Sequence, residues 1–213
     1  MGKGEFLFLL QGLKWTLLLA AVAFVGGTVS GLAVALARTS GFRLLERSTA
    51  GYIALFQGTP LLMQLFVVYY ALALAGLRLE AWEAVAIAFT LHASAYLGEI
   101  WRGSIDAVPR GQVEAAKALS LGYVSRMKDI ILPQAIRISL PATIGFLVQL
   151  IKGTSLAAFV GFTELARAGS MVSNQIFKPL LVYGVVGAIY FAICWPLSLY
   201  GSRLEHKFAA TTR

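Results

Sequence analysis

The chain alternates between long apolar runs and short charged segments. A helix needs about 20 apolar residues to cross a hydrocarbon core about 30 Å thick. Five runs reach or approach this length, at residues 15–37, 51–77, 81–101, 138–163 and 179–202. The third has the shortest uncharged core, but Trp82 and Trp101 flank it as tryptophans do at membrane interfaces. The fourth is interrupted by Lys152. The pattern predicts five transmembrane helices.

Basic residues are unevenly distributed among the segments that join these runs. Twelve Lys and Arg fall on the side of the C-terminus, including Arg213, five fall on the other side, and Lys152 lies within a run. Because Lys and Arg accumulate in cytoplasmic loops, we expect the N-terminus outside and the C-terminus and the 102–137 loop in the cytoplasm. The start resembles a secretory signal, but its apolar run continues to Ala37, so we expect an uncleaved first span.

The composition excludes several classes of protein. Hydrophobic residues make up 58% of the 213 positions, charged residues only 13%, and the mean hydropathy is +0.76. Soluble domains carry about 25% charged residues, so we expect an integral membrane protein with one domain, 1–213. The net charge of +8 is explained by basic cytoplasmic loops, and no nucleic-acid partner is expected. Cys194 is the single cysteine, and His92 and His206 lie too far apart to predict a metal site.

The loop at 102–137 contains a segment with the composition of a soluble helix. From Gln112 to Leu119 nearly every residue favours a helix. Ala115, Ala118 and Leu119 share one face, and Ala116 lies beside them. A face of such small residues suits insertion into a cleft of another protein. Gly122 is expected to end the helix with a turn, and Pro133 to start the next. A helix lying on the lipid surface is the alternative, but its apolar face is weak.

The sequences of this loop and its flanks resemble a known family. The motif letters are "EAAKALSLG" (114–122) with "ILP" (131–133), preceded by "GTPLLMQLFVVYY" (58–70) and "AYLGEIWRGSID" (95–106), and followed by "KGTSL" (152–156). They are similar to permease subunits of ATP-binding-cassette importers for polar amino acids, of the histidine, glutamine and arginine type. The chain departs from the commonest pattern at Gln57, Gly145 and Gly153, where Arg, Asn and Asp are frequent, which leaves the exact amino acid open.

The resemblance implies a fold, a function and a set of partners. The fold is the all-α type I importer permease, with about five transmembrane helices and a cytoplasmic coupling helix in the bacterial inner membrane. Its coupling residues are Glu114, Ala115, Ala116, Lys117, Leu119 and Gly122. The partners are a cytoplasmic ATPase dimer that binds ATP and Mg²⁺, a second permease copy or homologue, an extracytoplasmic substrate-binding protein and membrane lipid.

The chain itself is expected to be a transport subunit and not an enzyme. It has no GxxxxGK[ST] loop to hold phosphates, and we expect no cofactor or metal on it. An intramembrane protease is excluded because Ser94 and His92 point to opposite sides of a helix. A permease for another small polar solute such as an opine remains an alternative, and so does an ATP-independent channel or carrier.

Polar residues inside the spans are candidates for a substrate pathway, because burying them in lipid is costly. Lys152 is expected either to face the pathway or the partner subunit, or to pair structurally with another buried group. Pro60 is expected to loosen the second span and free carbonyls for a ligand. Glu99 and Arg102 form either a salt bridge or a gate, and His92 is expected to form hydrogen bonds between helices. The pathway candidates are Gln57, Thr59, Gln64, Glu99, Gln149, Lys152, Thr154 and Ser155.

Overall fold

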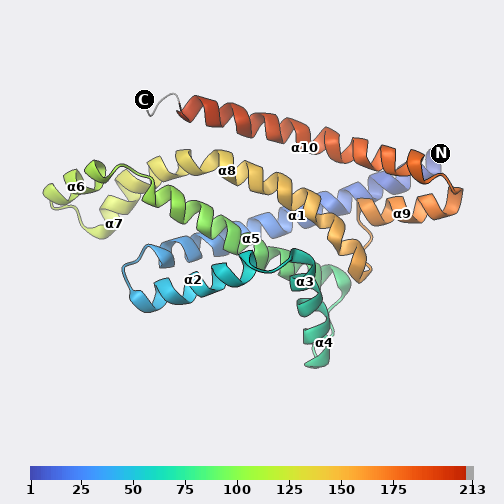
Figure 1. Ribbon diagram of the computed structural model, residues 1–213, viewed down its shortest axis with the longest axis horizontal. Helices are drawn as coiled ribbons and strands as arrows, with labels where there is room; N and C mark the ends of the chain where they lie inside the picture. The colour runs from blue at the N-terminus through green and yellow to red at the C-terminus, as the bar shows by residue number, and fades with distance from the viewer. Residues whose placement is uncertain (210–213) are drawn as a thin grey trace.

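A computed structural model describes residues 1–209, and Arg213 lies outside this range. All regular elements of the described residues are helical (Figure 1). They are α1 (Lys3–Arg38), α2 (Arg43–Gln57), α3 (Leu61–Phe66), the π-helix η1 (Val67–Ala71), α4 (Leu72–Leu74), α5 (Ala81–Asp106), α6 (Arg110–Ala118), α7 (Tyr123–Ser125), the π-helix η2 (Arg126–Ile131), α8 (Leu132–Gly153), the 3₁₀-helix η3 (Thr154–Val160), α9 (Leu165–Ile176) and α10 (Pro179–Ala209).

Four helical stretches are long and apolar enough to cross a membrane: α1, α5, the continuous 123–160 segment and α10. The predicted second span at 51–77 is not one straight helix. Its two parts, α2 and α3–α4, meet at an angle of 105°, and only together would they form a fifth span. The break falls where Pro60 lacks the N–H that a continuing helix needs.

The fourth span begins well before the predicted position. Helical structure starts at Tyr123, directly after Gly122, and continues through η2 into α8. Pro133 therefore lies inside the helix and does not start it. The π-helical turn immediately before Pro133 adjusts the backbone where proline removes a hydrogen-bond donor.

The closest helix pair is α1 with α5. A Cβ built at Gly31 would lie 3.0 Å from the Ser94 carbonyl oxygen, and one at Gly27 would overlap the Cβ of Ala93. Small residues four apart allow helices to approach closely inside a membrane. The "GGTVSG" segment of the first span, residues 26–31, therefore allows α1 and α5 to pack closely. The neighbouring core contains Phe89, which is fully buried.

The helices run along one long axis (Figure 1). At one end lie α6 and α7, and α10 finishes near the same end. The N-terminus and α9 lie at the opposite end, while α3 and α4 project sideways from the middle. The N-terminus and the 102–137 loop thus lie at opposite ends, as the distribution of basic residues predicts.

Candidate functional site

The end of the molecule is formed by a helical hairpin, residues 110–131, which we call the end hairpin. Helix α6 stops at Ala118 and its last turn is closed by two backbone bonds. Leu121 N donates to Ala116 O (3.1 Å) and Ser120 N donates to Lys117 O (2.9 Å). This is a Schellman C-cap, which requires a left-handed residue. That residue is Ser120, with φ 56°.

Gly122 was expected to make this turn, and that expectation is wrong. Its φ is −61° and its ψ is 166°, an extended conformation that any residue can adopt, and it precedes α7 as its N-cap. A side chain added at Gly122 would meet nothing within 4 Å. The turn is instead made two residues earlier, because α6 ends earlier than the position of the glycine suggests.

A small apolar cluster holds the end hairpin against the long helices. Val108, Met127, Ile131 and Ala135 are its buried members, and Val113 of α6 packs against them. Ala116 is only 1% exposed. This predicted coupling residue therefore faces the hairpin's own interior. Its small size allows α6 to lie close to η2.

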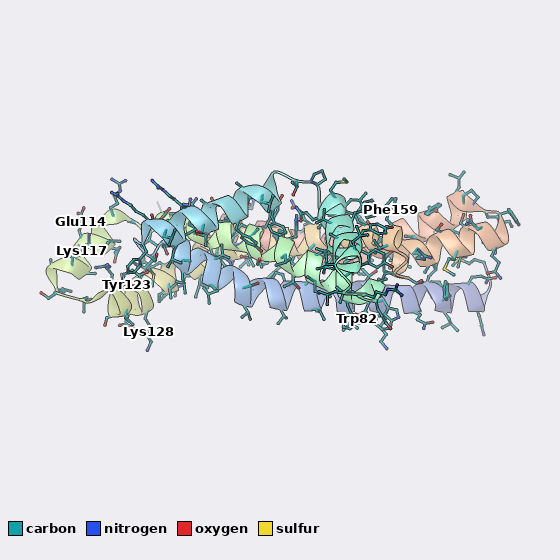
Figure 2. The ribbon with its side chains drawn as sticks, turned by 90° about the horizontal axis from the view of Figure 1, so that it is seen from below. Trp82, Glu114, Lys117, Tyr123, Lys128 and Phe159 are labelled. Carbon is teal, nitrogen blue, oxygen red and sulfur yellow. The ribbon has the colours of Figure 1, made fainter. Side chains whose placement is uncertain are left out.

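The outer surface of the end hairpin carries apolar side chains that nothing in residues 1–209 covers. Leu119 and Val124 are each 73% exposed, and Tyr123 is 45% exposed. Glu114, Lys117, Tyr123 and Lys128 all lie at this end of the molecule (Figure 2). An apolar patch at the tip of a charged segment is typical of a protein-binding surface. Sequence reasoning named Leu119 but missed Tyr123 and Val124, because it placed the second helix of the hairpin too late.

Glu114 lies in the middle of α6, since the helix already begins at Arg110. Its charge is therefore not placed at the helix N-terminus. Glu114 and Lys117 instead line a polar hollow of about 710 Å³ between the end hairpin and the ends of α1, α2 and α5. Ala115 is exposed.

The break between α2 and α3 is closed by the side chain of Gln64. Its Nε2 donates to the carbonyl oxygens of Phe56 (2.7 Å) and Thr59 (2.9 Å), and to Thr59 Oγ1 (2.9 Å). Its Oε1 pairs with His92 Nδ1 (2.9 Å). The carbonyls that Pro60 frees are thus occupied by Gln64, and are not open to a ligand as predicted. Gln64 is 8% exposed and has a structural role, and His92 forms the expected hydrogen bond between helices.

One face of α8 is open along much of the helix. Ala142, Gly145, Gln149 and Lys152 are all exposed and recur at spacings of three or four residues. Lys152 also lines a cleft of about 270 Å³ with Cys194, Trp195 and other residues of α10. Its ammonium group has no hydrogen bond or ion pair with any residue in 1–209. Of the two expectations for Lys152, a buried structural partner is therefore not found in the described chain.

The other predicted pathway residues divide into two groups. Gln57 and Gln149 are exposed, and neither side chain bonds within the described chain. The remainder bond internally. Thr59 Oγ1 donates to Leu55 O (2.7 Å), Ser155 Oγ donates to Lys152 O (2.8 Å), and Thr154 is fully buried with its hydroxyl on Ile151 O. Thr154 does not line an open surface, which corrects the prediction for this residue.

Glu99 is bound by Arg102. Arg102 Nε and Nη2 donate to the two carboxylate oxygens of Glu99, at 2.8 and 2.6 Å. The third nitrogen, Nη1, donates to Asp106 at 2.6 Å. A bidentate pair of this kind is geometrically specific. The structure thus shows the salt bridge at the end of α5, which was the simpler of the two predictions.

The second span was predicted to loosen at Pro60, and the fourth is interrupted by Lys152. The residues next to these two positions lie in contact in the structure. A Cβ at Gly153, next to Lys152, would lie 3.3 Å from Cδ2 of Leu61, which directly follows the α2–α3 break. Helix α3 therefore packs against the polar part of the fourth span.

Glu164 is a buried carboxylate that sequence reasoning missed. It is 0% exposed and caps α9 by accepting from Ala166 N and Arg167 N, both at 2.8 Å. Tyr190 OH donates to it at 2.9 Å and Thr16 Oγ1 at 3.4 Å. One side chain thus joins α1, α9 and α10. The signal in the sequence was an acidic residue three positions after Gly161, which follows the fourth span, at the position of a helix cap.

Within residues 1–209 no group of three or more His, Cys, Asp or Glu is placed to hold a metal ion.

Comparisons with known proteins agree with one another. The sequence profile of the family described as "Binding-protein-dependent transport system inner membrane component" matches residues 27–207. The "Probable amino-acid ABC transporter permease protein YckA" of Bacillus subtilis is 38% identical over 96% of this chain and 91% of its own. The arginine transport system permease protein ArtQ of the same organism is 34% identical, over 94% and 92%. A solved structure titled "Crystal structure of an amino acid ABC transporter with histidines" matches with a TM-score of 0.88 at 32% identity, over 94% of both chains.

Proposed function

The chain belongs to the family of binding-protein-dependent transport system inner membrane components, and on that premise we propose that it carries a polar amino acid across the bacterial cytoplasmic membrane. It is the permease subunit of an ATP-binding-cassette importer. The energy comes from a separate ATPase subunit. Relatives named as amino-acid transporter permeases match nearly the whole chain, and this supports an amino acid as the substrate.

The main structural support for an ATP-driven importer is the exposed apolar tip of the end hairpin. Leu119 directly follows α6 and Val124 lies in α7, and these two helices lie at the end of the molecule opposite the N-terminus (Figure 1). Exposed apolar side chains on a polar cytoplasmic segment are favourable only when a partner covers them. We propose that the tip docks into a groove of the ATPase, with Glu114, Ala115 and Lys117 at its rim. The proposal also fixes the orientation, with the end hairpin and C-terminus in the cytoplasm and the N-terminus outside.

The open face of α8 supports a second permease subunit. An unpaired lysine within a transmembrane helix faces lipid only at a high cost. Small residues at Ala142 and Gly145 would let a second copy or homologue approach, with Gln149 and Lys152 beside the passage between them. Gln57 is the remaining candidate for its lining. An extracytoplasmic binding protein delivers the amino acid to the end that carries α9.

The experiment is reconstitution. The permease, its ATPase and its binding protein are placed in proteoliposomes, and ATP-dependent uptake is measured with a panel of radiolabelled amino acids. Uptake that needs both ATP and the binding protein supports the proposal. Uptake of an opine but no amino acid would favour the related solute permease, and ATP-independent uptake would favour a carrier.

A further inference from the structure

A cleft between α1, α5 and α8 lies apart from the end hairpin's outer surface and from the open face of α8. Its volume is about 310 Å³. Helix α1 contributes Thr28 and Leu32 to its wall, α5 contributes Trp101 and Ile105, and α8 contributes one face between Leu132 and Thr143. The open face of α8 contributes no residue to the wall, so the cleft is separate from the proposed contact with a second permease subunit.

The wall of the cleft presents almost only apolar surface. Trp101 Nε1 donates to Thr143 Oγ1 at 3.0 Å, so these two polar groups are used within the chain. Ser139 Oγ likewise donates to Ile136 O at 3.0 Å. The hydroxyl of Thr28 has no partner within residues 1–209, but it is buried and offers no accessible atom. A polar solute would lose its hydration here without replacement, so the cleft suits an apolar occupant.

The cleft crosses the boundary between the hydrocarbon core and the headgroups. The uncharged run of the fourth span begins after Arg137, and Trp101 lies in the wall as an interfacial tryptophan. Leu132 lies five residues before Arg137, which places it about 8 Å outside this boundary, whereas Thr143 lies inside it. The headgroup layer on each side is about 5–8 Å thick. Ordinary membrane lipids therefore cover the inner part of the cleft with acyl chains, but leave its outer part beside polar headgroups.

Lys128 lies just outside this outer part. It precedes Leu132 by about one turn on the same side of the continuous 123–160 helix. Its side chain points away from the helices (Figure 2), and its ammonium group has no hydrogen bond or ion pair within residues 1–209. Basic side chains beside a membrane attract the phosphates of lipids. A lipid raised far enough to fill the outer part of the cleft would bring its phosphate to the level of Lys128.

We propose that the cleft holds an acyl chain of a phospholipid from the leaflet beside the end hairpin, and that the phosphate of this lipid pairs with Lys128. The chain covers the apolar wall that ordinary lipids leave beside headgroups. Ile105, Leu132 and Ala135 of the wall also belong to the cluster that holds the end hairpin. The bound lipid thus lies against the base of the hairpin. This site does not depend on which solute the permease carries.

The test uses the full-length permease purified in a maltoside detergent, which contains no phosphate. Two photoactivatable lipids carry the same reactive group on an acyl chain: a phosphatidylglycerol, and a diacylglycerol that lacks the phosphate. Peptide mapping compares labelling of residues 132–143 with labelling of α10, where Leu180 and Phe191 are exposed and give the background. We expect the phosphatidylglycerol to label residues 132–143 at least threefold above this background, and the diacylglycerol to label them less.

Three variants separate the phosphate from the acyl chain. Lys128→Gln should lower labelling by the phosphatidylglycerol to the level of the diacylglycerol, and leave the diacylglycerol unchanged. Ile136→Trp adds bulk at the edge of the cleft, at a position that is 56% exposed, and should lower labelling by both lipids. Arg137→Gln is the matched control, because Arg137 is an exposed cation of the same helix that does not line the cleft. It should change neither.

Labelling of residues 132–143 that is no stronger than labelling of α10 would overturn the inference. So would labelling by the phosphatidylglycerol that Lys128→Gln does not reduce. A second copy of the chain is the other candidate occupant. If a photoreactive residue in place of Ile136 formed cross-links between two permease chains, that copy would fill the cleft and the inference would be wrong. The proposed function is tested separately, since it fails if the complete importer takes up no amino acid in proteoliposomes.

Discussion

Gly27 is the tightest point between α1 and α5. A methyl group there would overlap the Cβ of Ala93, and the backbone of Ser94 lies at 3.2 Å. Both neighbours belong to a helix that is itself buried, so neither can move away easily. Glycine is therefore needed in the first span because it has no side chain and lets α1 touch α5. Its backbone flexibility is not the reason.

Gly27→Ala should destabilise the folded permease by about 1–3 kcal/mol, the usual cost of overpacking. Gly184→Ala is the matched control, since it lies inside α10 and its added methyl would meet nothing within 4 Å. The measurement is the unfolding temperature of each purified variant in the same detergent. Equal unfolding temperatures for Gly27→Ala and wild type would show that α1 and α5 are not packed this closely.

Ser120 adopts a backbone conformation that favours glycine, whereas Gly122 does not. Ser120→Gly should therefore stabilise the end hairpin by about 1 kcal/mol, because it removes the strain of a side chain at positive φ. Gly122→Ala should have almost no effect, since its φ is −61° and the space around it is open. Hydrogen exchange of the amides of α6 measures both. A larger effect at Gly122 than at Ser120 would contradict the observed turn.

Gly27 and Gly122 show which details at the residue scale can be predicted from the sequence and which cannot. The spacing of Gly27 and Gly31 within an apolar run is enough to predict helix contact. The turn after α6 is not predictable in the same way. Its position depends on where α6 ends, and Ser120 carries no side-chain signal for a left-handed conformation.

At the scale of elements, the α2–α3 break depends on one side chain from a neighbouring turn. Gln64 donates to two backbone carbonyls that the break leaves without helical partners, and His92 of α5 holds its oxygen. The break is thus a fixed bend joined to α5. It is not a loosely structured segment.

Gln64→Leu should destabilise the protein by about 1–3 kcal/mol for each partly buried carbonyl that loses its donor. Met63→Leu is the control, because Met63 is the adjacent residue and is 53% exposed. Unfolding in a denaturant series measures the difference. If the two variants were equally stable, the carbonyls of Phe56 and Thr59 would have to be satisfied by something other than Gln64.

Glu164 has a comparable role at the end of the molecule that carries α9. Glu164→Ala removes the cap of α9 and leaves Tyr190 OH and Thr16 Oγ1 without their acceptor. Loss of a cap costs about 0.5–2 kcal/mol, and each buried hydroxyl left unpaired adds to this. Proteolysis of the 161–178 segment should accelerate in Glu164→Ala and much less in Tyr190→Phe, which keeps the cap. Equal rates in the two variants would exclude α9 capping by Glu164.

The elements themselves were only partly predictable. Apolar run length identified the four long helices, because span length is set by membrane thickness. It did not predict that 51–77 is bent by 105°, nor that the fourth helix starts at Tyr123. Both errors come from proline. At Pro60 its effect is a full break, while at Pro133 a π-turn absorbs it, and local sequence does not distinguish the two.

At the scale of the whole molecule, the second half of the end hairpin (residues 123–131) and the open face of α8 are parts of one continuous helix. The segment 123–160 begins in the hairpin and carries Lys152 near its far end. The distribution of basic residues predicted that the hairpin and the N-terminus lie at opposite ends. The open face was predicted only as separate polar residues, since exposure depends on where α5 and α10 pack. A movement of this second half of the hairpin can thus reach the proposed pathway without crossing a loop.

If the end hairpin couples ATP hydrolysis to movement of the 123–160 helix, a substitution at its tip should uncouple the importer and leave the fold intact. Leu119→Asp replaces a side chain that is 73% exposed, so the isolated permease should keep its unfolding temperature. Burial of a leucine contributes about 1.5–3 kcal/mol, so affinity for the ATPase should fall about ten- to hundredfold. Glu114→Ala should lower substrate-stimulated hydrolysis with a smaller loss of binding.

Gln112→Ala is the matched control, because Gln112 is exposed on the same helix but lies away from the tip. The measurements are recovery of the ATPase on the purified permease and substrate-stimulated ATP hydrolysis in proteoliposomes. A hairpin that merely rests on the lipid surface would tolerate Leu119→Asp in both assays. Normal association together with normal stimulated hydrolysis in Leu119→Asp and Glu114→Ala would therefore rule out the end hairpin as the coupling element.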